Sequence, residues 1–334
     1  MKKIQKQLIL LSLFFMILLT AAGCGAKDGE TSGKTEVRIA YFPNITHTQA
    51  LVMKNQGTLE EKWKDTCNVT WTSFNAGPAE IEAIFAGEID LGYIGPVPAV
   101  NANVKSNGEV KIISNATNAG AVLLVRKDSG IASVKDLAGK KVAVPQLGNT
   151  QHLCLLSLLS ENGLKTVDQG GDVTINASSN ADILNLIDNG SVEAAVVPEP
   201  WGTTIEKNGN AEILLDYDEL FLNGEYPSAV VIANGDFMEE HPEYVKEFLE
   251  LHKEATLFIN ENSKEAQEIV NSEIESVTGK SIAADVLESA FSRMTADSSL
   301  NTEAVMTFAN ISEEEGFTSK LPEEEDVFNT EFNQ

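Results

Sequence analysis

Cysteine and histidine are scarce in this sequence of 334 residues, which has three of the first and four of the second. Three cysteines cannot build a disulfide-stapled scaffold, and neither residue type recurs at the spacing of a zinc or haem site. The sequence therefore predicts no metal centre and no cofactor. A chain of this length has room for two domains, each with its own core.

Positive charge is scarce as well, because 24 Lys and Arg residues face 50 Asp and Glu residues, for a formal net charge of −26. A chain this acidic has no overall field that would hold nucleic acid, so that partner is not expected. The arginines are Arg38, Arg126 and Arg293. Any bound anion is therefore expected to meet neutral donors rather than an arginine clamp, with Arg126 left open as a contributor.

Long hydrophobic runs are also missing. Leu8–Leu19, interrupted by Ser12, follows a basic start and is twelve residues long. At about 1.5 Å per residue it is too short to cross roughly 30 Å of hydrocarbon, but it fits the core of a signal peptide. Residues 1–23 are therefore predicted to be a signal peptide.

Thr20–Cys24 resembles the lipobox of bacterial lipoproteins, in which the cysteine is acylated and becomes the new N-terminus. The resemblance implies that Cys24 is lipidated. The residues after it have no hydrophobic period, which predicts that residues 24–35 form a flexible tether. The protein would then lie on the extracytoplasmic face of the cell membrane, held there by its acyl chains. Ordinary secretory cleavage that leaves Cys24 unmodified is the alternative.

After the tether, short β-rich runs alternate with helix-sized segments, which predicts an α/β fold with a mostly parallel sheet and helices on both faces. The expected strands are Val37–Tyr41, Val69–Phe74, Ile89–Tyr93, Val110–Ser114, Val122–Arg126, Lys141–Val144, Val173–Ile175, Ala194–Val197, Ile213–Leu215 and Ala229–Ile232. The expected helices include Ala79–Ala86, Ala99–Val104, Thr150–Asn162, Ala181–Asp188 and Pro200–Lys207. From Asp236 to Glu315 the pattern predicts helices and no strands.

Turn-rich segments at Asp128–Ser133 and Asp216–Tyr226 divide this body into two lobes. Residues 36–125 and 223–320 are predicted to form a discontinuous first lobe with a helical C-terminal region, and residues 126–222 a second lobe. Two chain crossings between lobes make a hinge that suits closure around a ligand. Residues 321–334 are predicted to be a loose acidic tail.

Proline, glycine and asparagine mark several places where a predicted strand ends and a helix begins. Proline suits the first helical position, and glycine lets the backbone approach a ligand closely. Free amide groups at such helix starts make an anion site without any charged side chain. In an α/β sheet these turns gather at the carboxyl ends of the strands, where ligands bind.

Five of these segments, taken in order, resemble the substrate-binding lipoproteins of the nitrate/sulfonate/taurine group of ABC importers, and the aliphatic-sulfonate binders most closely. They are Ile39–His47, Gly77–Ala83, Ala86–Pro96, Pro145–Thr150 and Pro198–Trp201. The resemblance implies a two-lobed periplasmic-binding-protein fold of type II, a monomer that captures a small-molecule anion or zwitterion and delivers it to ABC permease subunits. Carried over by position, the predicted ligand-binding residues are Asn44, Thr46, Gly77, Gly95, Pro96, Asn149, Thr150, Glu199 and Trp201. Asn118, near the expected crossing between the lobes, is the tenth predicted ligand-binding residue.

Some of these side chains, and two histidines, allow more than one role. Trp201 either covers a ligand tail or packs under a helix start. Glu199 either caps a helix or receives a ligand ammonium group, as a taurine-like zwitterion would require. His47 is expected to cap or pack, and His152 to lie in the core, because each belongs to a helix start or an apolar helix.

No constellation of nucleophile, base and orienting group points to an enzyme, and Thr278–Ser281 lacks the first glycine of a P-loop. Cys67 and Cys154 are expected to be buried free thiols. Three functions remain: capture of an aliphatic sulfonate or similar oxyanion, binding of nitrate or of a neutral heterocycle such as a thiamine-pyrimidine precursor, and a sensory or adaptor lipoprotein. The sequence does not name the ligand.

Overall fold

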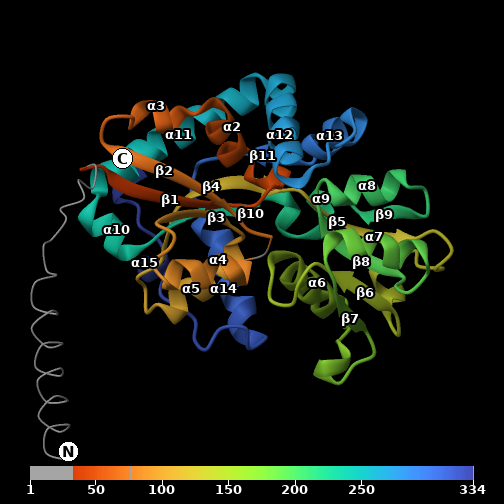
Figure 1. The fold of residues 1–334 in the computed structure, drawn as a ribbon. Helices are drawn as coiled ribbons and strands as arrows, with labels where there is room; N and C mark the ends of the chain where they lie inside the picture. Colours follow the sequence, from red (N-terminus) through yellow and green to blue (C-terminus); the bar gives the residue numbers. More distant parts are fainter. Residues whose placement is uncertain (1–32, 76, 334) are drawn as a thin grey trace, which may run out of the picture. The chain divides into compact units, whose positions relative to one another are not determined.

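The computed structural model describes residues 33–75 and 77–333 (Figure 1). The predicted signal peptide, Cys24 and most of the predicted tether lie outside the described residues. Residues Glu36–Gln334 form one compact unit, which holds two β-sheets. Within the described part of the chain, none of the helices combines the length and the apolar character that crossing a membrane requires.

The first sheet has six strands among the described residues, and its strand order is β11-β4-β10-β3-β1-β2. Their bounds are β1 (Thr35–Tyr41), β2 (Cys67–Ser73), β3 (Leu91–Ile94), β4 (Lys111–Ala119), β10 (Pro227–Ala233) and β11 (Met294–Ala296). β1 and β3 are parallel, with Ile39 opposite Leu91. β10 is antiparallel to both β3 and β4, so it divides the sheet into two parts.

The second sheet has five described strands in the order β7-β6-β8-β5-β9. Their bounds are β5 (Ala121–Arg126), β6 (Lys141–Val144), β7 (Thr174–Ala177), β8 (Ala194–Pro198) and β9 (Ala211–Leu215). β6 is parallel to β7 and β8, whereas β5 is antiparallel to β8 and β9. The first sheet therefore has two strands that run against the others, β10 and β11, and the second sheet has one, β5.

β5, β10 and β11 are exceptions to the parallel pairing that the sequence predicts. Two of them, β5 and β10, enter a sheet from the other lobe. The parallel strands of each sheet end on the side that faces the other lobe. A strand arriving from that lobe therefore runs against them. Hydrophobic periodicity reports that a segment is a buried strand, but not the direction in which it pairs.

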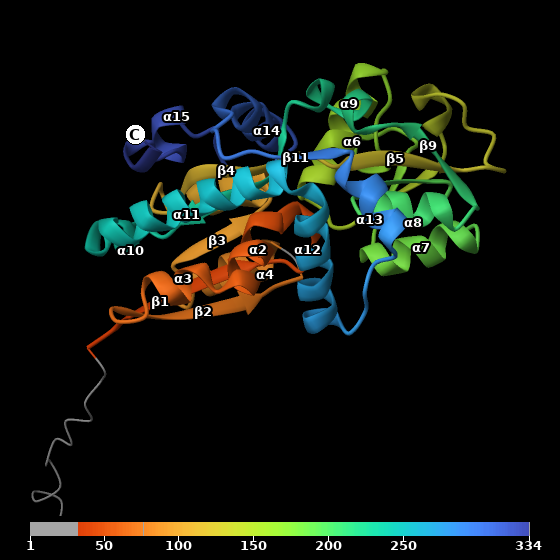
Figure 2. The same ribbon diagram turned by 90° about the horizontal axis from the view of Figure 1, so that it is seen from above.

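The chain first crosses between the sheets at Ala119 and Gly120, both in the left-handed region with φ of 61° and 79°. β4 runs directly into β5 through this kink, as Figure 2 shows from above. The sequence-based division placed residues up to 125 in the first lobe, but Ala121–Val125 pair within the second sheet. A continuous β-run hides this boundary because its composition does not change there.

Helices cover both faces of the first sheet (Figure 1). On one face Val37, Ile39 and Tyr41 pack with α2 (Thr48–Gln56), α3 (Thr58–Lys62), α10 (Gly235–Glu240), α11 (Pro242–Glu261), α12 (Ser263–Thr278) and α13 (Ala284–Phe291). On the other, Ala40 packs with α4 (Gly77–Phe85), α5 (Pro96–Lys105), α14 (Thr302–Glu314) and α15 (Glu324–Val327). Alternate residues of β1 thus serve two cores, as the period of two in a strand requires.

The second sheet is covered in the same way. Leu123 and Val125 pack with α6 (Thr150–Glu161), α9 (Tyr217–Leu220) and part of α14, whereas Val122 and Leu124 pack with α7 (Asn180–Asp188) and α8 (Trp201–Lys207). Short 3-10 turns complete the connections: Ile45–His47, Val134–Leu137, Val167–Gln169, Leu222–Gly224 and Glu331–Asn333. α14 is shared, because Phe308 enters the core of the second sheet and Val305 that of the first.

Two expectations for the C-terminal part are corrected. β11 lies inside the stretch predicted to be free of strands, and its three residues are too few to leave a periodic signal. The predicted loose tail is packed over its described residues, because Val327 and Phe328 are buried in the first core and Phe328 bridges to Ile112. Two apolar side chains are enough to anchor an otherwise acidic segment.

Candidate functional site

A cavity of about 890 Å³ lies between the two sheets. Turns that follow β1, β2, β3, β6 and β7 line it, together with the end of β8, parts of α4 and α5, Ser228 of β10 and Phe317 beyond α14. The carboxyl ends of parallel strands from both sheets therefore meet at one hollow. This is the arrangement that the turns of the sequence predict.

Six of the ten predicted ligand-binding residues line the cavity, and their predicted contact with a ligand stays a prediction. They are Asn44, Thr46, Gly77, Gly95, Asn149 and Thr150. The other four, Pro96, Asn118, Glu199 and Trp201, are not among its lining residues. Local composition thus located the turns, and the tertiary packing decided which residue of each turn reaches the hollow.

Two asparagines in the lining cap the helices that follow them. Asn44 Oδ1 accepts the Thr46 amide at 3.1 Å, and Asn149 Oδ1 accepts the His152 amide at 2.9 Å. These two amides are therefore already satisfied and are not offered to a ligand. At α6, the first two amides, those of Thr150 and Gln151, have no acceptor within the described residues. A helix start of this kind attracts an anion.

Gly95 and Thr150 bring the two lobes together at the cavity. A Cβ atom at Gly95 would lie 2.8 Å from Thr150 Oγ1, so any larger residue there would displace the Thr150 side chain. Gly95 precedes α5 in the first lobe, and Thr150 begins α6 in the second. The Thr150 hydroxyl, which has no hydrogen-bond partner among the described residues, is thus held at the junction of the lobes.

Glu199 does not face the cavity and acts as a cap, one of its two predicted roles. Its side chain is fully buried, and it accepts the Thr203 amide at 2.9 Å in the first turn of α8. Arg293 Nη1 lies 3.1 Å from its other oxygen. The N-terminus of α8 is therefore neutralised by the protein's own carboxylate, and the turn at Pro198–Trp201 does not offer an anion site.

The other predicted residues outside the cavity have structural partners. Asn118 donates to Asp297 at 2.9 Å and accepts from Asn115, which stabilises the polar end of β4. Trp201 packs against the apolar core beneath α7 and α8, as the second of its two interpretations required. Pro96 is buried as the first residue of α5.

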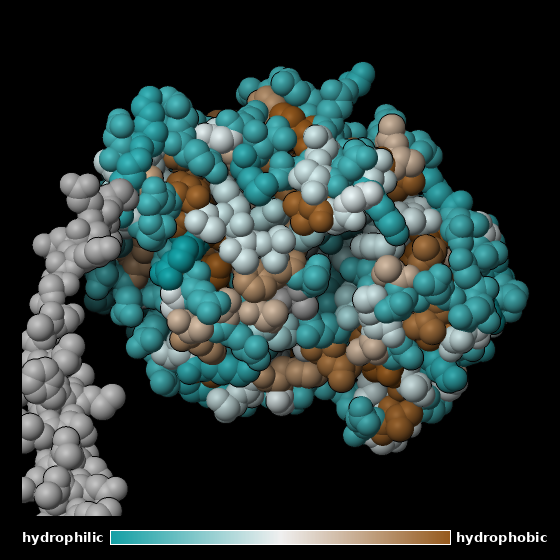
Figure 3. Space-filling view, viewed as in Figure 1, coloured by the Kyte–Doolittle hydropathy of each residue, from teal (hydrophilic) through white to brown (hydrophobic). Residues whose placement is uncertain are grey.

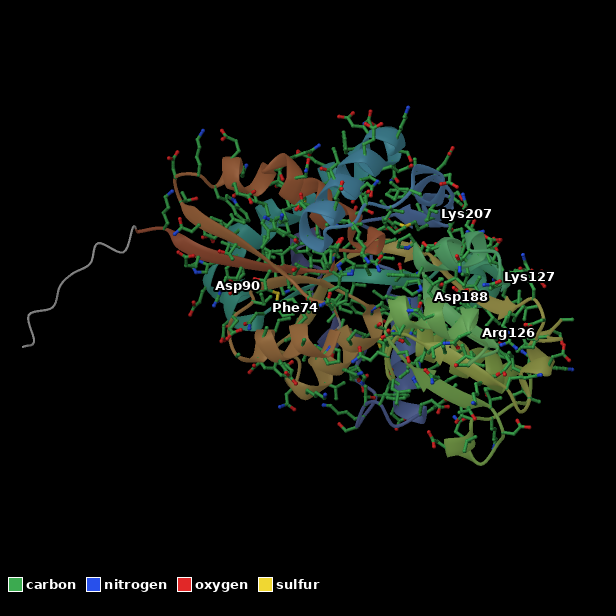
Figure 4. The ribbon with its side chains drawn as sticks, turned by 45° about the vertical axis from the view of Figure 1, so that its right-hand side comes forward. Phe74, Asp90, Arg126, Lys127, Asp188 and Lys207 are labelled. Carbon is green, nitrogen blue, oxygen red and sulfur yellow. The ribbon has the colours of Figure 1, made fainter. Side chains whose placement is uncertain are left out.

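None of the three arginines lines the cavity. Arg38 pairs with Asp90, Arg126 with Asp128, and Arg293 with Glu199. Figure 4 shows Arg126 near Lys127 and Asp188 in the second lobe, and Asp90 in the first. Arg126, which the sequence left open as a contributor, is therefore not among the residues that line this cavity.

Several lining residues are not among those predicted from the sequence. Lys105 is the only cation, and Glu82 the only carboxylate, among the lining residues that the structure describes. Both lie on helix faces, where a charge in the sequence looks like an ordinary solvated residue. Asn101 and Asn180 also line the cavity, and the side-chain oxygen of each is buried without a partner in the described structure.

The buried histidines are neutral acceptors. His47 Nδ1 accepts the Phe42 amide at 3.1 Å, and His152 Nδ1 accepts the Gly148 amide at 3.0 Å. Burial lowers the pKa of His47 to about 3 and that of His152 to about 4. The packing roles expected for both are confirmed. Cys67 and Cys154 are free and buried, as expected, and residues 33–75 and 77–333 hold no cluster of three metal-ligating side chains.

Two sheets with helices on both faces and a cavity at their adjoining edges define the class of two-lobed periplasmic binding proteins. The chain belongs to the NMT1-like family, whose model matches residues 30–273. It is 29% identical over 267 residues to a candidate aliphatic sulfonates-binding protein of Bacillus subtilis, covering 78% of this chain and 76% of that one. It is 31% identical over 181 residues to the taurine-binding periplasmic protein of Escherichia coli, or 54% of each chain.

The fold is shared with solved structures. The alkanesulfonate-binding protein of Xanthomonas axonopodis pv. citri, bound to MOPS, superposes with a TM-score of 0.72 at 23% identity. The match covers 88% of this chain and 98% of that one. The fold class is therefore confirmed. These relatives are named for what they bind and not for a reaction.

Proposed function

We propose that this chain is the extracytoplasmic solute-binding component of an ABC importer, and that its cavity captures a small oxyanion, an aliphatic sulfonate or a taurine-like compound. The observation that carries the proposal is the start of α6. There the Thr150 hydroxyl and the amides of Thr150 and Gln151 lie at a cavity where the two lobes meet. Such a group of neutral donors suits an oxyanion that stays charged at every physiological pH.

The energies are sufficient for useful binding. A hydrogen bond to a charged group contributes about 1.5–3 kcal/mol, and a helix N-terminus about 0.3–1 kcal/mol. The Thr150 hydroxyl, the amides of Thr150 and Gln151 and the Lys105 ammonium group would make four such contacts. Less the cost of immobilising the ligand, they leave roughly −8 kcal/mol, a micromolar dissociation constant.

The acidic surface of the protein does not prevent the binding of an anion in the cavity. Hydrophilic residues predominate on the face shown in Figure 3, with apolar residues in separate patches. At physiological salt, interactions between exposed charges are largely screened beyond about 8 Å. The field at the cavity is therefore set by the groups that line it, and not by the net charge of −26.

A neutral heterocycle is the second candidate, and Asn101 and Asn180 favour it, as they also favour a taurine-like zwitterion over a simple sulfonate. The buried side-chain oxygens of these residues have no donor in the described structure. An ammonium or ring N–H group would satisfy them, whereas nitrate has no hydrogen to give. Leaving a buried acceptor unpaired costs about 1–3 kcal/mol, so a ligand that pairs these oxygens would gain affinity.

A thermal-shift panel of alkanesulfonates, taurine, nitrate, phosphonates and pyrimidines tests the ligand class. We expect alkanesulfonates or taurine to raise the melting temperature, because a ligand at 100 times its dissociation constant adds about 2.7 kcal/mol. The variant Thr150→Val keeps the side-chain shape and removes the hydroxyl donor. It should weaken the binding of the sulfonate about 10- to 100-fold, the equivalent of one charge-assisted hydrogen bond.

Thr302→Val is the matched control. Thr302 begins α14 after Asn301, whose side chain accepts the Ala304 amide as Asn149 accepts that of His152. Thr302 is outside the cavity, so its variant should bind the sulfonate as the wild type does. A panel in which only pyrimidines shift the transition, or equal loss in the two variants, would overturn the oxyanion site. Loss of sulfonate uptake on deletion of the gene separates an importer component from a sensory lipoprotein.

Lipid anchoring at Cys24 is a further part of the proposal. Cys24→Ser should abolish labelling of the protein by radioactive fatty acid, because the acyl chains are attached to this cysteine. Without these chains the protein should move from the membrane fraction to the soluble extracytoplasmic fraction. Cys67→Ser and Cys154→Ser, which alter the two buried thiols, should leave the labelling unchanged. Retention of the label in Cys24→Ser would contradict lipidation at this residue.

A further inference from the structure

The loop between β6 and α6 supplies the donors of the proposed site, and His152 holds its shape. Gly148, in the left-handed region with φ of 71°, donates its amide to His152 Nδ1 at 3.0 Å. The His152 amide in turn reaches Asn149 Oδ1 at 2.9 Å. His152 therefore stabilises this turn through two hydrogen bonds, one with the Gly148 amide and one with the Asn149 side chain. It is almost fully buried, and its low pKa, about 4, keeps Nδ1 an acceptor at neutral pH.

Phe317, from the far end of the chain, closes over the same loop. Its ring lies edge-on to the His152 ring, with 5.3 Å between centroids. A Cβ atom at Gly148 would lie 3.1 Å from Phe317 Cδ1, so the ring fills the space that the missing side chain leaves. Phe317 also lines the cavity and packs against the core of the second sheet.

The position of Phe317 is set by both lobes. It follows α14, which contacts α5 of the first lobe and α6 of the second. The turn after α14 is held by the amides of Phe317 and Thr318, which both donate to Ser312 O, at 2.7 and 3.1 Å. The ring is therefore fixed relative to Gly95, which precedes α5, as well as to the loop that it covers.

We propose that Phe317 and His152 are positioning residues that hold the β6–α6 loop in its ligand-binding conformation, so that a residue at the end of the chain controls ligand affinity at the site. This inference rests on the proposed function for its effect on binding, but not for its effect on the loop. A loop that samples other conformations lowers the apparent affinity by the fraction of time that it is competent. Neither residue needs to touch the ligand.

The test measures the hydrogen exchange of the loop in the ligand-free protein and, separately, the affinity of the protein for a ligand. Amide hydrogen exchange of residues 146–151 is followed in the ligand-free protein, and binding of butane-1-sulfonate is measured by calorimetry. We expect Phe317→Ala and His152→Leu each to speed exchange of this segment at least 10-fold and to weaken butane-1-sulfonate about 10-fold. His152→Gln offers a side-chain oxygen in place of Nδ1 and should restore both quantities to near the wild-type values.

Phe332→Ala is the matched control for loss of a C-terminal phenylalanine. Phe332 is partly buried against the first core and is not among the lining residues. Its variant should leave exchange of residues 146–151 and sulfonate affinity unchanged, even where the melting temperature falls. The proposal is overturned if Phe317→Ala changes this segment no more than Phe332→Ala does, or if His152→Gln behaves as His152→Leu. If the wild type binds neither butane-1-sulfonate nor taurine, the proposed function fails, and the exchange rates still decide the inference.

Discussion

Replacing Arg293 by alanine is expected to lower the free energy of unfolding by about 3–5 kcal/mol, the cost of removing one partner of a buried ion pair. The guanidinium contacts three carboxylates, with Glu199 at 3.1 Å, Asp216 at 2.9 Å and Glu206 at 3.5 Å. The Glu199 side chain is fully buried and that of Arg293 is 13% exposed. Without Arg293, the Glu199 carboxylate would be left in the interior with only Thr203 as a partner.

The stability lost in Arg293→Ala should depend on pH, and the ionisation of Glu199 decides whether the loss grows or shrinks as pH rises. Burial raises the pKa of Glu199 even beside Arg293. In the variant the folded-state pKa rises further, so the folded protein holds a proton that the unfolded chain releases above about 4.5. The deficit relative to wild type should therefore be smallest below that pH and grow toward neutral pH. The double variant Arg293→Ala with Glu199→Gln should lose less at pH 7 than Arg293→Ala alone.

Lys207→Ala supplies the comparison for Arg293→Ala, because Lys207 of α8 pairs with Asp285 of α13 on the surface. Their side chains are 37% and 70% exposed, and pairs of this kind contribute about 0–1 kcal/mol. Chemical denaturation at pH 5 and pH 7 measures all four proteins. If Arg293→Ala proved no less stable than Lys207→Ala, the ion pair would have no role in holding the fold.

Glu80→Gln is expected to stabilise the protein at neutral pH and to flatten its pH profile. Glu80 is fully buried on α4, where a Cβ atom at Gly92 would overlap its carboxyl group. Neither of its oxygens has a hydrogen-bond partner among the described residues, and burial raises its pKa well above 4.5. The folded state therefore keeps Glu80 protonated at pH values where the unfolded chain releases the proton.

The sign follows from this difference in bound protons. Where the folded state binds more protons than the unfolded state, stability falls as pH rises. The stability that protonated Glu80 contributes is fully present below about pH 4.5. Above that pH, the free energy of unfolding falls by about 1.4 kcal/mol per pH unit until the folded-state pKa of Glu80 is reached. Glutamine keeps the shape and removes the titration, so the advantage of Glu80→Gln should grow between pH 5 and pH 8.

Glu82→Gln is the control for Glu80→Gln, because it changes an exposed carboxylate two residues along the same helix. Its denaturation profile should run parallel to that of the wild type from pH 5 to pH 8. A Glu80→Gln profile that is also parallel to the wild type would mean that an unseen partner compensates the buried carboxyl group.

The turns of the site could be predicted because their signals are local. Gly95 and Pro96 mark the start of α5, and Asn149 marks that of α6, through backbone preferences that act within a few residues. The carboxyl-end rule then places these turns at one edge of each sheet. Six of the ten predicted residues consequently line the cavity. The remaining four belong to the same turns or strands, but their side chains point into the protein's own structure.

The residues that the sequence analysis missed are joined to the site by long-range packing. Phe317 is 169 positions from Gly148 in the chain, and nothing in its own neighbourhood indicates that it would lie against that loop. Lys105 and Glu82 occupy ordinary helix faces, and only the placement of α4 and α5 beside the second lobe brings them to the cavity. Neither residue could be separated in advance from the other charged side chains of an acidic protein.

The amino-acid sequence by itself determined the α/β class and the turns at the strand ends, because both depend on composition or on residues close together in the chain. Only the tertiary structure decided the direction of β5 and β10, the pairing of Glu199 with Arg293, and the place of Phe317 over the loop of α6. These features join segments separated by tens to hundreds of residues. Their energies come from burial and contacts that exist once the chain has folded, so no local pattern carries them.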